Sequence, residues 1–168
     1  VWARLRPGDP VSLAGPLGTA YLRDRHRGPI LAIAGGSGLA PIKSIVETAL
    51  ARDPARPIRL YFGARDERDL YLVEHFTALA ARHADLRFVP VLSDPRRRTA
   101  HRIGLVQDAA AEALASLAGA KAYLAGPPAM VEAASALLQA SGLPRADIHA
   151  DPFYSAAEMA ARAAAATA

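Results

Sequence analysis

The sequence contains no cysteine among its 168 residues. This absence excludes a disulfide framework, a thiolate zinc site and a cysteine-held iron–sulfur cluster within the chain. Aromatic residues make up only 6% and are not interleaved with basic residues, so we expect no nucleic-acid partner. Long apolar runs are also missing. The longest uncharged one, Ile30 to Ile42, is shorter than the ~20 residues of a membrane span, so we expect none.

The N-terminal residues show neither a signal peptide nor an initiator methionine. Residues 1–15 carry scattered charges and no apolar core, so we expect no secretory signal and a cytoplasmic location. Because the first residue is Val1, we expect the chain to begin inside a longer protein. The net charge of +4 comes mostly from arginine. It suits a solvated basic surface, or affinity for phosphate or an acidic partner.

Apolar runs of strand length alternate with helical stripes after residue 29. We predict strands at 30–34, 58–62, 86–92, 121–125 and 148–149, with amphipathic helices between them. This alternation predicts an α/β fold: a five-stranded parallel sheet with helices on both faces. Pro90 lies within the third strand, which suggests that this strand is at a sheet edge.

The chain divides into three segments by composition. Residues 1–28 hold an alternating run at 10–14, a turn at 15–18 and a charged linker that begins at Arg23. We interpret them as the end of a preceding all-β domain. Residues 29–154 form the α/β domain. Residues 155–168 are an alanine-rich tail, which favours helix but is too short and too poor in large apolar groups to be stable alone.

Small, rigid or cationic residues follow every predicted strand, at the edge where an open parallel sheet binds its ligand. In the first loop, Gly36 and Gly38 allow a sharp turn and close approach, and Pro41 suits the first turn of the next helix. The N-terminus of that helix attracts an anion, and a pyrophosphate fits. A plain tight turn remains the alternative. The other strand-end candidates are Gly35, Ser37, Gly63, Arg65, Ser93, Asp94, Gly126, Pro127, Pro128, Met130 and Phe153.

Two of these loops carry charge. Arg65 can bind phosphate oxygens in a bidentate way, or instead form an ion pair with one of the acidic residues that follow it. The run 96–98 is three arginines, which could hold a 2′-phosphate or an acidic partner, or lie in a solvated loop.

Several competing motifs fail. Pro41 occupies the position of the third glycine in the usual dinucleotide fingerprint, and Leu39 breaks a serine-hydrolase elbow around Ser37. The five histidines have no metal-ligand spacing, so we predict no metal site, and we expect His75 and His83 to be surface or packing residues.

Taken together, these motifs resemble the ferredoxin–NADP reductase superfamily. Residues 35–41 are similar to its G-[TG]-[GST]-G-[IL]-[AT]-P loop, 61–65 to its Y-x-G-x-R strand, and 125–130 to its C-G-P-x-x-M motif. Residues 8–18 resemble the end of its flavin-binding barrel. The match runs from about Gly8 to Tyr154. It is most similar to reductase components of aromatic-ring-hydroxylating dioxygenases of the naphthalene dioxygenase type.

The resemblance implies a route for electrons. NAD(P)H would give a hydride to FAD, and single electrons would pass to a [2Fe–2S] ferredoxin or oxygenase component. The glycine loop and residues 126–128 would hold the dinucleotide. Ser37 and Phe153 are the catalytic candidates: Ser37 near the nicotinamide and flavin rings, Phe153 stacked on the isoalloxazine. Pro16 and Gly18, at the barrel end, are further cofactor-binding candidates.

Departures from the family pattern bear on the cofactors. Ala125 stands where the family has a cysteine, and the flavin-binding motifs and iron–sulfur cysteines are absent. We therefore expect FAD to be bound mainly by segments missing from this chain, and a [2Fe–2S] centre to lie elsewhere in the protein or on a partner. Asp94 after Ser93 favours NADH, with NADPH tolerated. A non-catalytic dinucleotide-binding module is the alternative function, and a hydrolase using Ser37 is a third.

Overall fold

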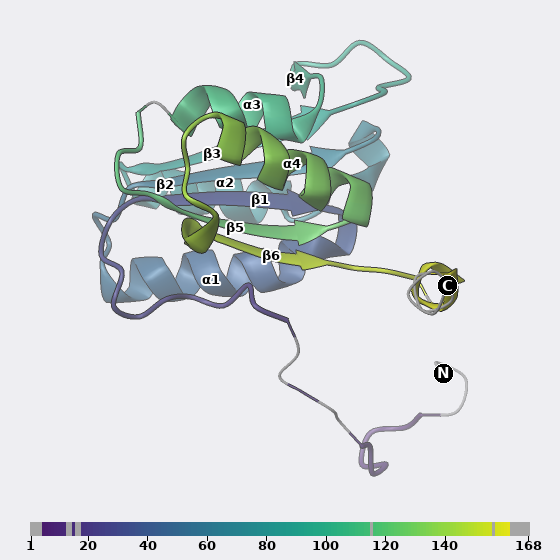
Figure 1. Cartoon of the computed structure of the whole chain (residues 1–168). Coiled ribbons are helices and arrows are strands. Elements are labelled where there is room, and N and C mark those ends of the chain that lie inside the picture. The colour runs from purple at the N-terminus through teal and green to yellow at the C-terminus, as the bar shows by residue number, and fades with distance from the viewer. Residues whose placement is uncertain (1–4, 13–14, 16–17, 115, 156, 162–168) are drawn as a thin grey trace.

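The computed structural model describes residues 5–12, 15, 18–114, 116–155 and 157–161. Within these ranges the chain forms a six-stranded parallel sheet in the order β4-β3-β2-β1-β5-β6 (Figure 1). The strands are β1 Ile30–Gly35, β2 Ile58–Ala64, β3 Leu86–Leu92, β4 Arg102–Ile103, β5 Lys121–Gly126 and β6 Ile148–Pro152. The helices are α1 Leu39–Arg52, α2 Val73–Arg82, α3 Val106–Leu114 and α4 Pro128–Ala140, with 3-10 turns η1 Gly36–Gly38, η2 Glu67–Asp69 and η3 Arg145–Asp147.

Helices cover both faces of the sheet, as the sequence predicts. Along β1 the side chains alternate between two apolar cores: Ile30, Ala32 and Ala34 pack with α1 and α2, while Leu31 and Ile33 pack with α3 and α4. These five residues are fully buried. The continuous apolar run of β1 is therefore explained by its central place between two helical layers.

The predicted count of five strands is wrong by one. The additional strand, β4, is only two residues long and pairs with Val91 and Leu92 of β3. Both β4 residues are exposed, so no apolar run marks them in the sequence. The edge position inferred from Pro90 is confirmed for most of β3, because no strand among the described residues pairs with the outer side of residues 86–90.

The segment before β1 is attached to the domain without being a strand. Residues 10–12 of the predicted strand at 10–14 are not in a sheet, and 13–14 lie outside the described residues. A strand needs a partner, and among the described residues none lies beside this one. Residues 18–29, which we call the connector, run back along the domain (Figure 1). There Arg56 is almost fully buried and donates to the carbonyl oxygens of His26 (2.8 Å) and Gly28 (3.0 Å).

In the alanine-rich tail, residues 157–161 are helical. Ser155 caps this turn: its hydroxyl accepts from the N–H of Glu158, and its own N–H donates to the Glu158 carboxylate. The division of the chain at residues 28 and 154 remains a prediction.

Candidate functional site

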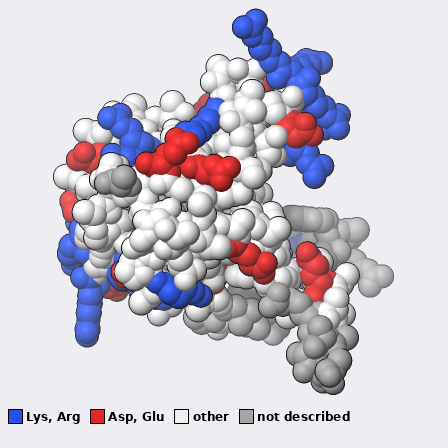
Figure 2. Space-filling model, turned by 45° about the horizontal axis from the view of Figure 1, so that its top comes forward, with Lys and Arg blue, Asp and Glu red and all other residues white. Residues whose placement is uncertain are grey.

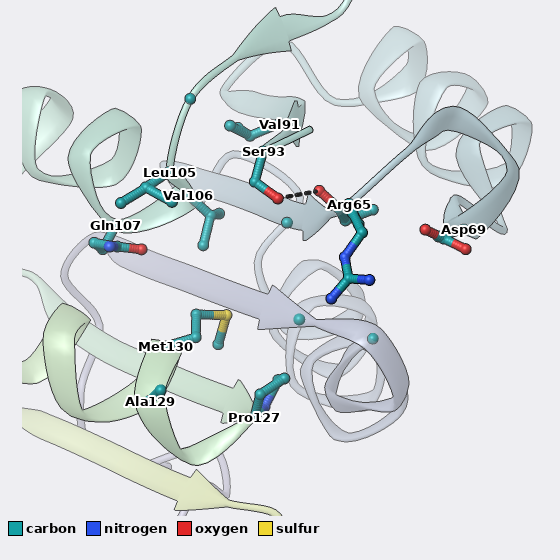
Figure 3. Close-up of a pocket in the computed structure, with 15 residues that line it drawn as sticks. Arg65, Asp69, Val91, Ser93, Leu105, Val106, Gln107, Pro127, Ala129 and Met130 are labelled. Carbon is teal, nitrogen blue, oxygen red and sulfur yellow. Dashed lines mark hydrogen bonds between the residues drawn. The ribbon is translucent and has the colours of Figure 1, made fainter. Parts of the chain in front are cut away.

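A cavity of about 420 Å³ opens at the carboxyl ends of the parallel strands (Figure 3). Seven of the predicted binding residues line it: Gly35, Gly36, Gly63, Arg65, Ser93, Pro127 and Met130. They come from the ends of β1, β2, β3 and β5, or from the loops that follow these strands, and from the first turn of α4. Four of the five expected strand ends therefore converge, and the end of β6 does not contribute to the lining. We call this cavity the strand-end pocket.

Glycines bring the ends of β1 and β5 into backbone contact beside this pocket. A Cβ atom on Gly38 would lie 2.6 Å from the amide nitrogen of Gly126 and closer still to the carbonyl oxygen of Ala125. A Cβ on Gly126, whose φ is +145°, would lie 2.7 Å from the carbonyl oxygen of Gly35. We call Gly35, Gly38 and Gly126 the glycine corner. Only glycine fits at positions 38 and 126 without moving backbone, whereas a Cβ on Gly35 would meet the Met130 side chain at 2.5 Å.

Gly36 differs from the glycine corner because it is exposed. Its φ is +51°, and a Cβ there would meet nothing within 4 Å. Its backbone therefore faces open space at the pocket rim, where a ligand can approach.

Two helices begin beside the glycine corner without a side-chain cap. Gly38 is the N-cap of α1 and Pro127 that of α4; neither helix has a capping side chain or an acidic residue in its first turn. The N–H of Leu39, which begins α1, donates back to the carbonyl oxygens of Gly36 and Ser37 in η1. The positive end of each helix dipole is nevertheless left without a side-chain anion, which suits an anionic ligand. Pro41 lies in the first turn of α1 and Pro128 begins α4, where a proline costs no hydrogen bond.

Arg65 is the pocket's cation. Its guanidinium extends toward the pocket (Figure 3), and no ion pair joins it to an acidic residue among those described. Asp66, one of its expected alternative partners, instead accepts N–H groups from Arg68 and Arg96. These donors lower the pKa of the Asp66 carboxyl, the Arg96 N–H most strongly.

Tyr71 holds the glycine loop in place, and sequence reasoning missed it. Its hydroxyl donates a 2.9 Å hydrogen bond to the carbonyl oxygen of Gly36, and its ring packs edge-on against Phe62 at 5.4 Å. Burial raises the pKa of the Tyr71 hydroxyl, so it remains a donor at neutral pH. The signal available in the sequence was an aromatic residue just before a predicted helix.

Other unpredicted lining residues come from the turn after β4 and from the start of α3. Gly104, Leu105, Val106 and Gln107 line the pocket, and Gly104 has a φ of +137°. They were missed because the short strand before them was missed. The remaining unpredicted members are Ala64, Asp69, Val91 and Ala129.

Several predicted site residues lie outside the pocket lining. Ser37 is exposed in η1, and among the described residues no histidine or carboxylate forms a hydrogen bond with its hydroxyl, so nothing supports a hydrolase. Asp94 is exposed. Its N–H donates to the backbone carbonyl oxygen of Arg65, which extends the hydrogen bonding between β2 and β3 by one residue pair. Phe153 is 42% exposed, and its N–H donates to the carbonyl oxygen of Gly126 at 2.9 Å.

Of the two candidates at the predicted barrel end, Pro16 and Gly18, the described residues include Gly18. Gly18 lies against Asp151 of β6, away from the strand-end pocket. Pro16 lies outside the described residues.

The histidine within α2 and the one that follows it have hydrogen-bond partners. His75 lies 2.7 Å from the Glu47 carboxylate, and the Nδ1 atom of His83 lies 3.1 Å from the carbonyl oxygen of Pro54. Within the described part of the chain, no cluster of His, Asp or Glu could hold a metal ion. No helix in that part is long and apolar enough to cross a membrane.

The sequence model of the oxidoreductase NAD-binding domain matches residues 32–136, which include most of the sheet and the strand-end pocket. This chain belongs to that family. The resemblance to ferredoxin–NADP reductases is thereby confirmed.

Known proteins of similar sequence are reductase components of oxygenase systems. The chain is 47% identical over 154 residues to the reductase component of the naphthalene 1,2-dioxygenase/salicylate 5-hydroxylase systems of Ralstonia sp., covering 92% of this chain and 47% of the relative. It is 45% identical to the corresponding component of the Pseudomonas putida naphthalene 1,2-dioxygenase system, with the same coverage. The chain thus spans about half the length of these curated relatives.

Solved structures give the same fold. A cytochrome P450 reductase of Amycolatopsis superposes with a TM-score of 0.77 at 42% identity, over 83% of this chain and 42% of that one. The ferredoxin reductase of carbazole 1,9a-dioxygenase superposes with a TM-score of 0.72 at 30% identity, over the same shares.

Proposed function

We propose that this chain is the NAD(P)H-binding part of a flavin-dependent reductase that passes electrons from NAD(P)H through FAD to an iron–sulfur acceptor, a ferredoxin or an oxygenase component. The observation that carries the proposal is the strand-end pocket, where the exposed turn at Gly36, the uncapped N-terminus of α4 and Arg65 lie together. Family membership and the names of the relatives support it. We also propose a cytoplasmic location, because that is where cells keep the NADH that the enzyme would consume.

The residues present fit a dinucleotide. The open backbone at Gly36 and the N-terminus of α1 suit the pyrophosphate. The Arg65 guanidinium, which has no ion-pair partner among the described residues, adds charge-assisted hydrogen bonds to phosphate or ribose oxygens. Val91, Val106 and Met130 form an apolar wall that excludes water from the bound nucleotide.

The nicotinamide end would lie beside the glycine corner. Gly126, Pro127 and Pro128 form a rigid edge there, and the backbone of Phe153 is joined to Gly126. In this proposal Ser37 lies near the nicotinamide, and the Phe153 ring covers the flavin until the nicotinamide displaces it. The chain's contribution to hydride transfer is then proximity and orientation.

FAD is bound mainly by a part of the protein outside this chain. Its chemistry, when bound, is to accept a hydride and release electrons one at a time. The described residue proposed to contact the flavin is the exposed Phe153.

We propose NADH as the preferred donor, with NADPH tolerated. Asp94 follows Ser93 at the end of β3, and a carboxylate there repels a 2′-phosphate. The arginines at 96–98 act in the opposite direction and account for the tolerance. A ratio of kcat/KM for NADH over NADPH below one, which Asp94→Asn leaves unchanged, contradicts this assignment.

The decisive experiment uses the full-length protein reconstituted with FAD. Under anaerobic conditions, NADH should bleach the visible absorption of the flavin. If NADH binds but the flavin stays oxidised, the chain is a non-catalytic dinucleotide-binding module instead. If NADH does not bind, the assignment of the strand-end pocket is wrong.

A further inference from the structure

One face of β6 is occupied by the connector. Side chains two apart on a strand point to the same side, and both His149 and Asp151 contact connector residues. The N–H groups of Thr19 and Ala20 donate to the two oxygens of the Asp151 carboxylate, at 2.5 and 3.0 Å. One carboxylate thus captures two successive backbone amides, an arrangement with charge-assisted hydrogen bonds.

The connector is shaped to accept this carboxylate. Gly18 has a φ of +84°, and a Cβ atom there would lie 2.6 Å from Oδ1 of Asp151. Any side chain at position 18 would therefore displace Asp151 and strain the backbone as well. Ala20, next to the contact, is buried. The fit on both sides distinguishes this contact from a chance pairing of surface groups.

A second contact fixes the connector to the same strand. The Arg23 guanidinium donates to the carbonyl oxygen of Thr19 and to Nδ1 of His149, both at 3.1 Å. The N–H of Arg23 donates to the Tyr123 hydroxyl at 3.0 Å. Burial, and then the charge of Arg23, lower the pKa of His149 to about 4, so its ring is neutral and accepts the arginine's hydrogen bond at pH 7.

Asp151 is connected to the glycine corner through the backbone. In the sheet it pairs with Ala125, and the N–H of Phe153, two residues on, donates to Gly126 in the glycine corner. Asp151, which holds the connector, is therefore two residues from Phe153, whose N–H joins the end of β6 to the glycine corner.

We propose that Asp151 is a positioning residue. It locks the connector against β6 and so sets the orientation of the nucleotide pocket relative to whatever part of the protein precedes residue 18. The catalytic consequence rests on the proposed function. Hydride transfer requires reacting atoms ~3–3.5 Å apart, and a misplacement of ~1 Å costs roughly 100-fold in rate. A loosened connector should slow hydride transfer without weakening nucleotide binding.

The test compares variants of the full-length protein loaded with FAD. Asp151→Asn keeps the size of the side chain but removes its charge and replaces one of the two acceptor oxygens by an N–H₂ donor, which then faces a backbone N–H. We expect the rate constant of flavin reduction at saturating NADH to fall by roughly 10- to 100-fold, with the NADH dissociation constant and flavin content unchanged. The matched control is Asp147→Asn. It removes an ion pair with Lys121 just before β6 and leaves the connector alone, so the rate should not change.

Gly18→Ala probes the same contact from the connector side, and it carries the test if Asp151→Asn does not fold. It should slow flavin reduction as Asp151→Asn does. The double variant should be no slower than the slower single variant, because the two changes break one contact.

The outcomes separate the two proposals. If NADH reduces the wild-type flavin and Asp151→Asn reduces as fast as Asp147→Asn, the positioning role is wrong and the proposed function stands. If wild-type flavin is not reduced, the proposed function fails. The rate of trypsin cleavage at the exposed Arg25 and Arg27 of the connector then tests whether Asp151 holds the connector against β6. Faster cleavage in Asp151→Asn than in Asp147→Asn supports it, and equal rates overturn it.

Discussion

Gly38 provides a direct test of the backbone contact at the glycine corner. Its φ is −61°, so alanine can adopt its conformation and any cost of Gly38→Ala must be steric. The added Cβ would lie 2.6 Å from the Gly126 nitrogen and closer to the Ala125 carbonyl oxygen. To reach ordinary contact, α1 and β5 must separate by more than about 1 Å. Overpacking typically costs ~1–3 kcal/mol, and we expect about 3 kcal/mol because both obstacles are backbone atoms.

The control is Gly142→Ala, at the end of α4. Gly142 has a φ of +95° and nothing within 4 Å of a Cβ position, so the substitution costs only the ~1–2 kcal/mol of the left-handed conformation. At ~2–4 °C per kcal/mol, Gly38→Ala should lower Tm by roughly 6–12 °C and the control by roughly 2–8 °C, so at any one slope the Gly38 variant should lose more. Thermal unfolding followed by far-ultraviolet circular dichroism measures both. Equal Tm values would show that the two strand ends are not in tight contact.

Three further predictions concern the pocket and the connector. Tyr71→Phe removes a hydrogen bond to Gly36 worth ~1 kcal/mol, so NADH should bind about fivefold more weakly in a fluorescence titration; unchanged affinity refutes a role in holding the loop. Arg65→Ala should raise KM for NADH roughly 10- to 100-fold while Tm is unchanged, because no described residue pairs with Arg65; a fall in Tm instead of a rise in KM argues against a ligand-binding role. For His149 the folded pKa of about 4 lies below the ordinary histidine value of 6.5, so between these values the unfolded chain binds a proton that the folded chain does not. Lowering the pH from 7 to 4.5 should therefore reduce the free energy of unfolding, by ~1–2 kcal/mol after allowance for solvent screening. The reduction should be smaller in His149→Gln, and urea unfolding at the two pH values would measure both.

The fold could be predicted because most of its elements are specified locally. The uncharged run of β1 and the helical stripes of α1 and α4 each signal their own structure, and α/β alternation then fixes the parallel sheet. What could not be predicted is β4. Arg102 and Ile103 have no strand pattern of their own, and their pairing depends on the free outer edge of Val91 and Leu92, which exists only once the sheet has formed.

The site was predictable where it is made of backbone. Gly36 and Pro127 were found because a turn or a rigid helix start needs a particular residue type. Tyr71 and Leu105 were missed because an ordinary tyrosine or leucine acquires a role only from its place in space. Tyr71 reaches a carbonyl group 35 residues away in the sequence. No rule of spacing within one sequence identifies such a contact.

The glycines show how far residue type alone can be interpreted. The sequence assigned Gly36 and Gly38 to cofactor binding because both lack a Cβ atom, and Gly18 because its segment resembles the end of a flavin-binding barrel. The structure gives each glycine a different reason. Gly36 has a positive φ at an open rim, and Gly38 has a negative φ at a crowded corner. Gly18 has a positive φ and lies against the carboxylate of Asp151, more than 130 positions away in the sequence. Alanine substitution should therefore strain the backbone at Gly36, separate two strands at Gly38 and release the connector at Gly18. Because these effects differ in kind, stability, nucleotide affinity and hydride-transfer rate must be measured separately to tell a binding glycine from a packing one.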